Sequence, residues 1–101
     1  MSVRIENTDG IMRARLSGEI DHHLASGMRE ELDLAILREK PHALLLDFTD
    51  VSFMDSSGIG LVMGRYRLMN ENGGQVEVLG TSPQIRKVMR LAGLDRLAKF
   101  S

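Results

Sequence analysis

The residues with the most evident chemical potential form one short segment, Asp-Ser-Ser-Gly-Ile-Gly, at positions 55–60. The segment lies where a helix is expected to begin. Helix N-termini present unpaired backbone N–H groups and partial positive charge, which suit anionic oxygens. Ser56 or Ser57 is an N-cap by residue type, and Gly58 and Gly60 are expected to keep the first turn bare. The segment therefore predicts either a plain serine cap or an accessible serine hydroxyl that can be phosphorylated.

A second segment, Asp-His-His at positions 21–23, has residue types that bind metal ions. Consecutive helix residues point about 100° apart, so His22 and His23 do not converge on one ion. We expect Asp21 to cap a helix that begins with two partly exposed histidines. No metal site is predicted.

A glycine-rich stretch at positions 58–64 resembles a dinucleotide-binding fingerprint, but its third glycine falls one position late. The stretch also does not follow a strand directly, and we expect no bound nucleotide cofactor. Gly60 and Gly64 are instead predicted to let a helix approach the sheet closely. The three histidines cannot be placed in a Ser-His-Asp arrangement. The chain is therefore not expected to be an enzyme.

The composition indicates one small globular domain without an electrostatic preference for nucleic acid or an anionic membrane. The 101 residues carry a net charge of −1, with 43% hydrophobic and 27% charged residues. Cysteine is absent, which excludes disulfides and thiolate metal sites. We expect no signal peptide and no membrane span, and hence a cytoplasmic protein. The following cations are expected on solvated helix faces: Arg65, Arg67, Arg86, Lys87 and Arg90.

The elements that position these residues begin with a predicted hairpin. Apolar and polar residues alternate over 3–6 and 12–17 around an Asp-Gly turn, and the second strand is expected to end at Gly18 and Glu19. Apolar residues at helical spacing then predict a helix from Asp21 to just before Pro41.

The second half of the chain alternates strands and helices. The apolar run 43–46 predicts a strand buried on both faces, followed by a loop over 47–55 and a helix ending near residue 72. A strand at 76–78 and a helix from Ser82-Pro83 to Gly93 follow. Residues 97–100 are expected to form a short strand or a docked tail. The order predicts an α/β fold, a mixed sheet whose later strands are parallel and packed against helices.

Five stretches together resemble a known family. They are Gly-Glu-Ile-Asp-His-His at 18–23, Leu-Asp-Phe-Thr-Asp-Val-Ser-Phe-Met-Asp-Ser-Ser-Gly-Ile-Gly at 46–60, Gly-Arg-Tyr at 64–66, Ser-Pro at 82–83 and Ala-Gly-Leu at 92–94. This pattern is similar to a STAS domain of the anti-anti-sigma type, and it covers essentially residues 1–101 as a single domain. The family usually has a further C-terminal helix, so we expect that helix to be short or missing here.

The resemblance implies a binding switch. The unphosphorylated protein would bind an anti-sigma factor that is also a serine kinase carrying ATP or ADP, and the sigma factor would be released. Phosphorylation of Ser56 would switch the protein off, and a PP2C-type phosphatase would restore it. The residues implied at the partner surface are Asp21, Asp55, Ser56, Ser57, Gly58, Ile59 and Gly60.

Two other readings stay open from the sequence. A small nucleotide-binding or phosphotransfer protein would bind ligand or turn it over by itself. A STAS module that serves only as a scaffold would lack a serine that a partner kinase modifies. The Asp-Ser-Ser-Gly segment favours the switch over the scaffold.

Overall fold

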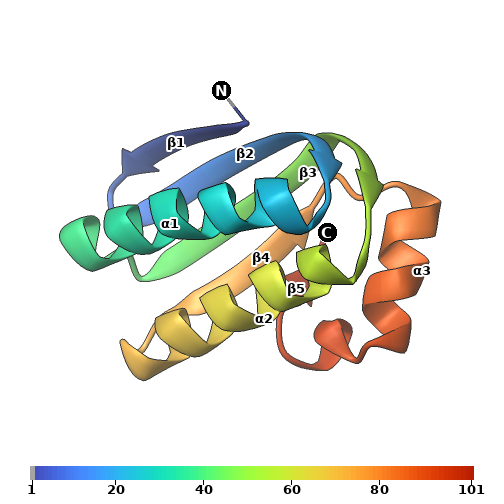
Figure 1. Cartoon of the computed structure of the whole chain (residues 1–101). Helices are drawn as coiled ribbons and strands as arrows, with labels where there is room; N and C mark the ends of the chain where they lie inside the picture. The colour runs from blue at the N-terminus through green and yellow to red at the C-terminus, as the bar shows by residue number, and fades with distance from the viewer. Residues whose placement is uncertain (1) are drawn as a thin grey trace.

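The computed structural model describes residues 2–101, which form a five-stranded sheet with three α-helices (Figure 1). The sheet order is β1-β2-β3-β4-β5, with β1 antiparallel to β2 and the other neighbours parallel. The elements in chain order are β1 (Val3–Thr8), β2 (Ile11–Ile20), α1 (His22–Glu39), β3 (Ala43–Met54), α2 (Ser56–Glu71), β4 (Gln75–Leu79), α3 (Pro83–Leu91), a 3₁₀ helix η1 (Leu94–Arg96) and β5 (Lys99–Phe100). The predicted α/β fold with a mixed sheet is confirmed.

Local sequence signals explain most element boundaries. Asp9 and Gly10 both have positive φ, as the tight turn of the β1–β2 hairpin requires. The Ser82 side chain accepts a hydrogen bond from the backbone N–H of Ile85, and Pro83 opens α3 as predicted. Gly93 adopts the left-handed conformation just past the end of α3.

Two predicted strand ends are wrong. β2 does not end at Gly18 and Glu19 but continues to Ile20, and the expected loop over 47–55 is mostly strand, because β3 runs to Met54. β3 pairs with β2 over this extension through two register irregularities. These bulges break the alternation of apolar and polar residues, which is why the extension resembles a loop in the sequence.

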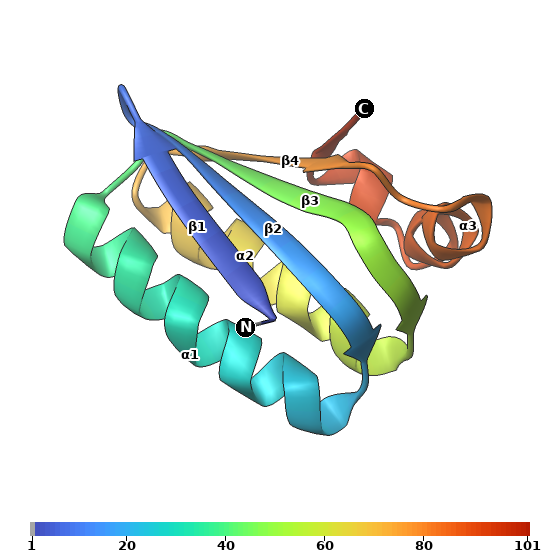
Figure 2. The same ribbon diagram turned by 90° about the horizontal axis from the view of Figure 1, so that it is seen from above.

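The helices α1 and α2 lie on the same face of the sheet (Figure 2), and α3 lies beside the end of β3. On β3 the residues that face α1 and α2, Leu44 and Leu46, are fully buried, whereas Leu45 on the other face is half-buried. The prediction of a strand buried on both faces is therefore wrong at Leu45. A run of leucines cannot reveal that the covering helices lie on one side.

The face of the sheet opposite α1 and α2 holds a fully buried carboxylate, Asp47 on β3. One of its oxygens accepts hydrogen bonds from the backbone N–H and the hydroxyl of Thr49, and the other lies 2.6 Å from Nη2 of Arg13. Burial alone raises the pKa of Asp47, but the hydrogen bonds from Thr49 and Arg13 outweigh it and lower the pKa to about 2. Asp47 is therefore ionised throughout the neutral range.

Gly80, in the connection between β4 and α3, packs against the Asp47 carboxylate. A Cβ at Gly80 would come within 2.8 Å of Oδ1 of Asp47 and within 2.8 Å of the backbone nitrogen of Thr49. The positive φ of Gly80 adds strain for any other residue. Glycine at position 80 therefore lets the backbone approach the buried Asp47 carboxylate closely.

Two predictions about α2 are corrected by its packing. Arg65 is buried rather than solvated. Gly60 and Gly64 have open space where a Cβ would stand, so they do not bring the helix closer to the sheet. Gly58 is the glycine in close contact, because a Cβ there would collide with the side chain of Met54.

Candidate functional site

The site forms where the parallel strands β2 and β3 end side by side and pass into α1 and α2. Asp21 follows β2 and caps α1, its carboxylate accepting a hydrogen bond of 2.9 Å from the backbone N–H of Leu24. Asp55 follows β3, and its backbone N–H donates to the carbonyl of Ile20 over 3.1 Å. Both helices therefore begin at the carboxyl ends of neighbouring strands, and an aspartate directly precedes each helix.

Asp55, not a serine, is the N-cap of α2. Its Oδ1 accepts a hydrogen bond of 2.7 Å from the backbone N–H of Ser57. The sequence prediction of Ser56 or Ser57 as the cap is therefore wrong. Aspartate and serine both cap helices well, and the backbone places Asp55 in the extended conformation that a cap requires.

The two serines differ in their surroundings as a consequence. Ser56 is the first residue of α2 and is exposed, whereas Ser57 is half-buried. The Ser56 side chain is therefore accessible to solvent at the N-terminus of α2. A free hydroxyl on the first turn of a helix can enter the active site of another protein, and its phosphate would lie at the positive end of the helix dipole.

A cleft of about 330 Å³ reaches Ser57, between the N-terminal halves of α1 and α2. Its lining residues are His22, Ala25, Ser26, Arg29, Ser57, Gly60 and Leu61. Gly60 is exposed on the cleft wall. Sequence reasoning missed Ser26 and Arg29, because no local signal in α1 shows that these residues face the first turn of another helix.

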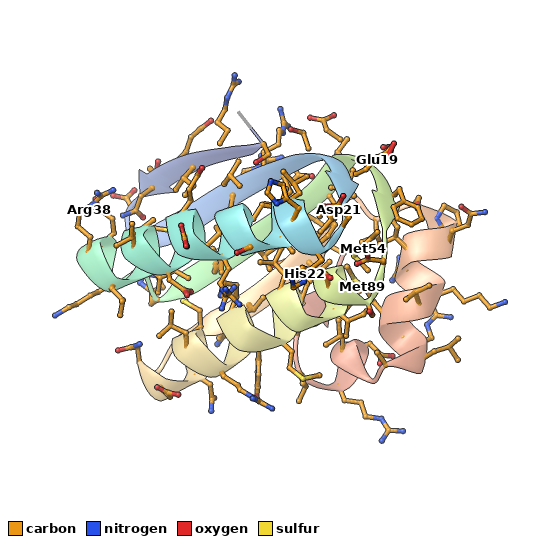
Figure 3. The ribbon with its side chains drawn as sticks, viewed as in Figure 1. Glu19, Asp21, His22, Arg38, Met54 and Met89 are labelled. Carbon is orange, nitrogen blue, oxygen red and sulfur yellow. The ribbon has the colours of Figure 1, made fainter. Side chains whose placement is uncertain are left out.

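The remaining residues of the predicted partner surface differ in their exposure to solvent. Asp21 is exposed and Ile59 is half-buried, whereas Gly58 is buried against Met54. Gly58 therefore does not keep the first turn bare for a partner. Figure 3 shows Asp21 and His22 at this end of the molecule and Arg38 at the opposite end of α1.

The histidines at the start of α1 are exposed, as predicted. Within the described residues 2–101, no group of three or more His, Cys, Asp or Glu side chains is arranged to hold a metal ion. No helix in the same range is long and apolar enough to cross a membrane.

A buried ion pair lies deeper between the two helices. Nε of Arg65 on α2 is 2.9 Å from Oδ1 of Asp33 on α1, with side-chain exposures of 7% and 34%. The N–H is not aimed at the oxygen, so the contact is ionic and both atoms lack a hydrogen bond. Burial lowers the pKa of Arg65, Asp33 opposes that shift and Arg29 adds to it. This pair fixes α1 against α2 below the cleft.

The sequence and the fold both identify the family. Residues 2–101 match the STAS domain family, and the chain belongs to it. The anti-sigma F factor antagonist of Paenibacillus polymyxa is 35% identical over 97 residues, which cover 96% of this chain and 83% of the relative. Within the STAS family, the chain is thus grouped with the anti-sigma factor antagonists.

Two solved structures of one such protein resemble the chain over almost its whole length. The unphosphorylated form of the anti-sigma factor antagonist SpoIIAA has a TM-score of 0.85 at 35% identity, covering 98% of this chain and 87% of that one. The phosphorylated form of SpoIIAA from Bacillus has a TM-score of 0.78, covering 98% and 90%. A protein of this fold is therefore known with and without phosphate.

Proposed function

We propose that this protein is an anti-sigma factor antagonist whose binding is switched by phosphorylation of Ser56. The unphosphorylated form binds an anti-sigma factor with serine kinase activity and so releases the sigma factor. The kinase transfers a phosphoryl group from its own ATP, and a PP2C-type phosphatase removes it. We place these events in the cytoplasm, where ATP and the transcription machinery are found.

The observation that carries the proposal is the exposed position of Ser56 on the first turn of α2. Its neighbours suit a kinase substrate, since Gly60 leaves open space one turn further along and the backbone N–H of Ser57 donates to Asp55, which fixes the start of the helix. ATP and Mg²⁺ belong to the kinase in this scheme, so the chain needs no cofactor of its own.

Phosphorylation acts through charge. It adds about −1.5 to −2 charges at pH 7, and these charges would lie beside Asp55 and close to Asp21. Inside an interface, like charges repel and are costly to desolvate. A loss of about 3 kcal/mol corresponds to roughly a hundredfold weaker binding, so the protein can be switched off without refolding.

The test is phosphate mapping by mass spectrometry after incubation with a candidate anti-sigma kinase and ATP. We expect one added phosphoryl group, located on Ser56. A second arm titrates ATP alone into the protein by calorimetry and should show no heat of binding. Phosphate on another residue, or binding of ATP by the isolated chain, would contradict the proposal.

A further inference from the structure

The end of β3 presents an aromatic side chain to solvent close to Ser56. Phe53 is 52% exposed and precedes Ser56 by three residues. The other two phenylalanines are better covered, since Phe48 is fully buried and Phe100 is half-buried. Burial of this ring in an interface would remove its apolar area from water, and Phe53 lies at the strand end that leads directly to Ser56.

A β-bulge places Phe53 on the outside. Gly18 of β2 pairs with Val51, but the next residue, Glu19, pairs with Phe53, so Ser52 is an extra residue on β3. In a regular strand, residues 51 and 53 would share a face. Here Val51 and Met54 are buried, while residues 52 and 53 are exposed. Bulges near functional sites commonly redirect a side chain in this way.

The surroundings of Phe53 are acidic. Glu19 on β2 is its cross-strand neighbour and is exposed. Asp21 follows Glu19 by two residues, directly after the end of β2. Asp55 follows Phe53 by two residues on the other strand. Figure 3 shows Glu19 and Asp21 together at this end of the molecule. An aromatic ring beside carboxylates suits a partner surface that combines an apolar pocket with arginine or lysine.

We propose that Phe53 is an aromatic anchor of the interface with the anti-sigma factor, seated in an aliphatic pocket of the partner next to a cation that pairs with Glu19. The inference rests on the proposed function and names the contact that gives it affinity. Buried aromatic residues dominate the binding energy of many interfaces. Phe53 precedes Ser56 by three residues and carries no hydroxyl that a kinase could modify, so the anchor and the switch are separate residues.

The test measures binding of each variant to the cognate anti-sigma factor by calorimetry. Phe53→Ala should weaken binding at least about tenfold, whereas Phe53→Tyr, which keeps the ring, should bind within about threefold of the wild type. Glu19→Lys should weaken binding independently of the ring. Leu34→Ala is the matched control, since Leu34 is 68% exposed near the other end of α1, and it should bind as the wild type does. Thermal melts of all variants establish that they are folded.

The outcomes separate this inference from the proposed function. Wild-type affinity of both Phe53→Ala and Glu19→Lys, in a protein that the kinase still phosphorylates on Ser56, would overturn the anchor and leave the switch intact. An equal loss in Leu34→Ala would also overturn it, because the effect would not be specific to this surface. If the wild-type protein does not bind the anti-sigma factor, both proposals fail.

Discussion

Arg13 on β2 and Asp47 on β3 form a close ion pair across the sheet, with Nη2 of Arg13 2.6 Å from Oδ2 of Asp47. The carboxylate is fully buried, whereas the arginine side chain is 47% exposed. The pair lies on the face that α1 and α2 leave uncovered, and Thr49 satisfies the second oxygen. It therefore links the two strands that lead to the site.

Acid should weaken the fold through Asp47. Because its pKa in the folded protein, about 2, is below the unfolded value, its contribution is complete above about pH 4 and is lost as the pH falls toward 2. At about 1.4 kcal/mol per pKa unit, the contribution at pH 7 is roughly 2 kcal/mol. Urea melts from pH 7 to pH 2 should show this loss in the wild type and a flatter profile in Asp47→Asn. An unchanged profile in Asp47→Asn would exclude this carboxylate as the cause.

The two leucines in the middle of β3 should differ in their importance. Leu46→Ala creates a cavity under α1 and α2 and should lower the free energy of unfolding by about 2–5 kcal/mol. Leu45 is half-buried on the other face, so Leu45→Ala should cost clearly less. Denaturant melts of both variants provide the comparison, and equal losses would mean that both faces are covered alike.

The Arg65–Asp33 pair should respond asymmetrically to substitution. Asp33→Ala leaves the guanidinium of Arg65 buried without a counter-charge and should cost at least about 2 kcal/mol. Arg65→Met keeps the apolar volume and leaves Asp33, which is one-third exposed, accessible to water. That variant should stay within about 1 kcal/mol of the wild type. Chemical denaturation measures both, and a larger loss in Arg65→Met would contradict this argument.

Gly60→Arg should block binding without harming the fold. Gly60 is exposed and has open space where a Cβ would stand, so the substitution should not destabilise and can gain up to about 1 kcal/mol of helix propensity. The long side chain would project from the wall of the cleft between α1 and α2. Calorimetry with the anti-sigma factor should show at least about tenfold weaker binding. Gly60→Ala is the matched control, and binding by Gly60→Arg as tight as by the control would remove the cleft wall from the interface.

Substitutions at the two serines should separate the switch from its neighbour. Ser56→Ala should bind the anti-sigma factor whether or not the kinase has been supplied with ATP, because the substitution adds no charge and removes the hydroxyl that would be phosphorylated. Ser56→Asp should bind at least about tenfold more weakly, and only in part like the phosphoprotein, since one carboxylate carries less charge than a phosphate. Ser57→Ala should remain a kinase substrate, because Asp55 provides the cap. Ser56→Asp binding as tightly as the wild type would refute the assignment.

The features predicted correctly from the sequence are those that depend on residues close together in the chain. The Asp9-Gly10 turn, the capping role of Asp21 and the Ser82-Pro83 start of α3 all depend on neighbours a few residues away, and all are confirmed. The order of strands and helices followed from the same signals. The sequence also placed Ser56 at the start of α2, although the cap is the preceding residue, Asp55.

The predictions that failed depend on distant partners. Arg65 resembles a surface cation in sequence, and it is buried because Asp33 meets it from another helix. Asp47 resembles a loop residue, and it is buried because Arg13, 34 positions earlier, pairs with it. The cleft needs the packing of α1 on α2, which no periodicity within either helix reveals. Non-local ion pairs and bulges were thus the information that was missing.

The two bulges in the β2–β3 ladder fix the number of residues between Asp47 and Asp55. Deleting or inserting one residue there would exchange inward and outward side chains from the change onward and rotate the start of α2 about its axis. Exposed turns such as Asn72-Gly73 lie outside this ladder and do not set its register. Natural variation in chain length should therefore accumulate in such turns, and protein engineers who graft other recognition sequences onto this scaffold should keep the spacing of the 47–55 segment unchanged.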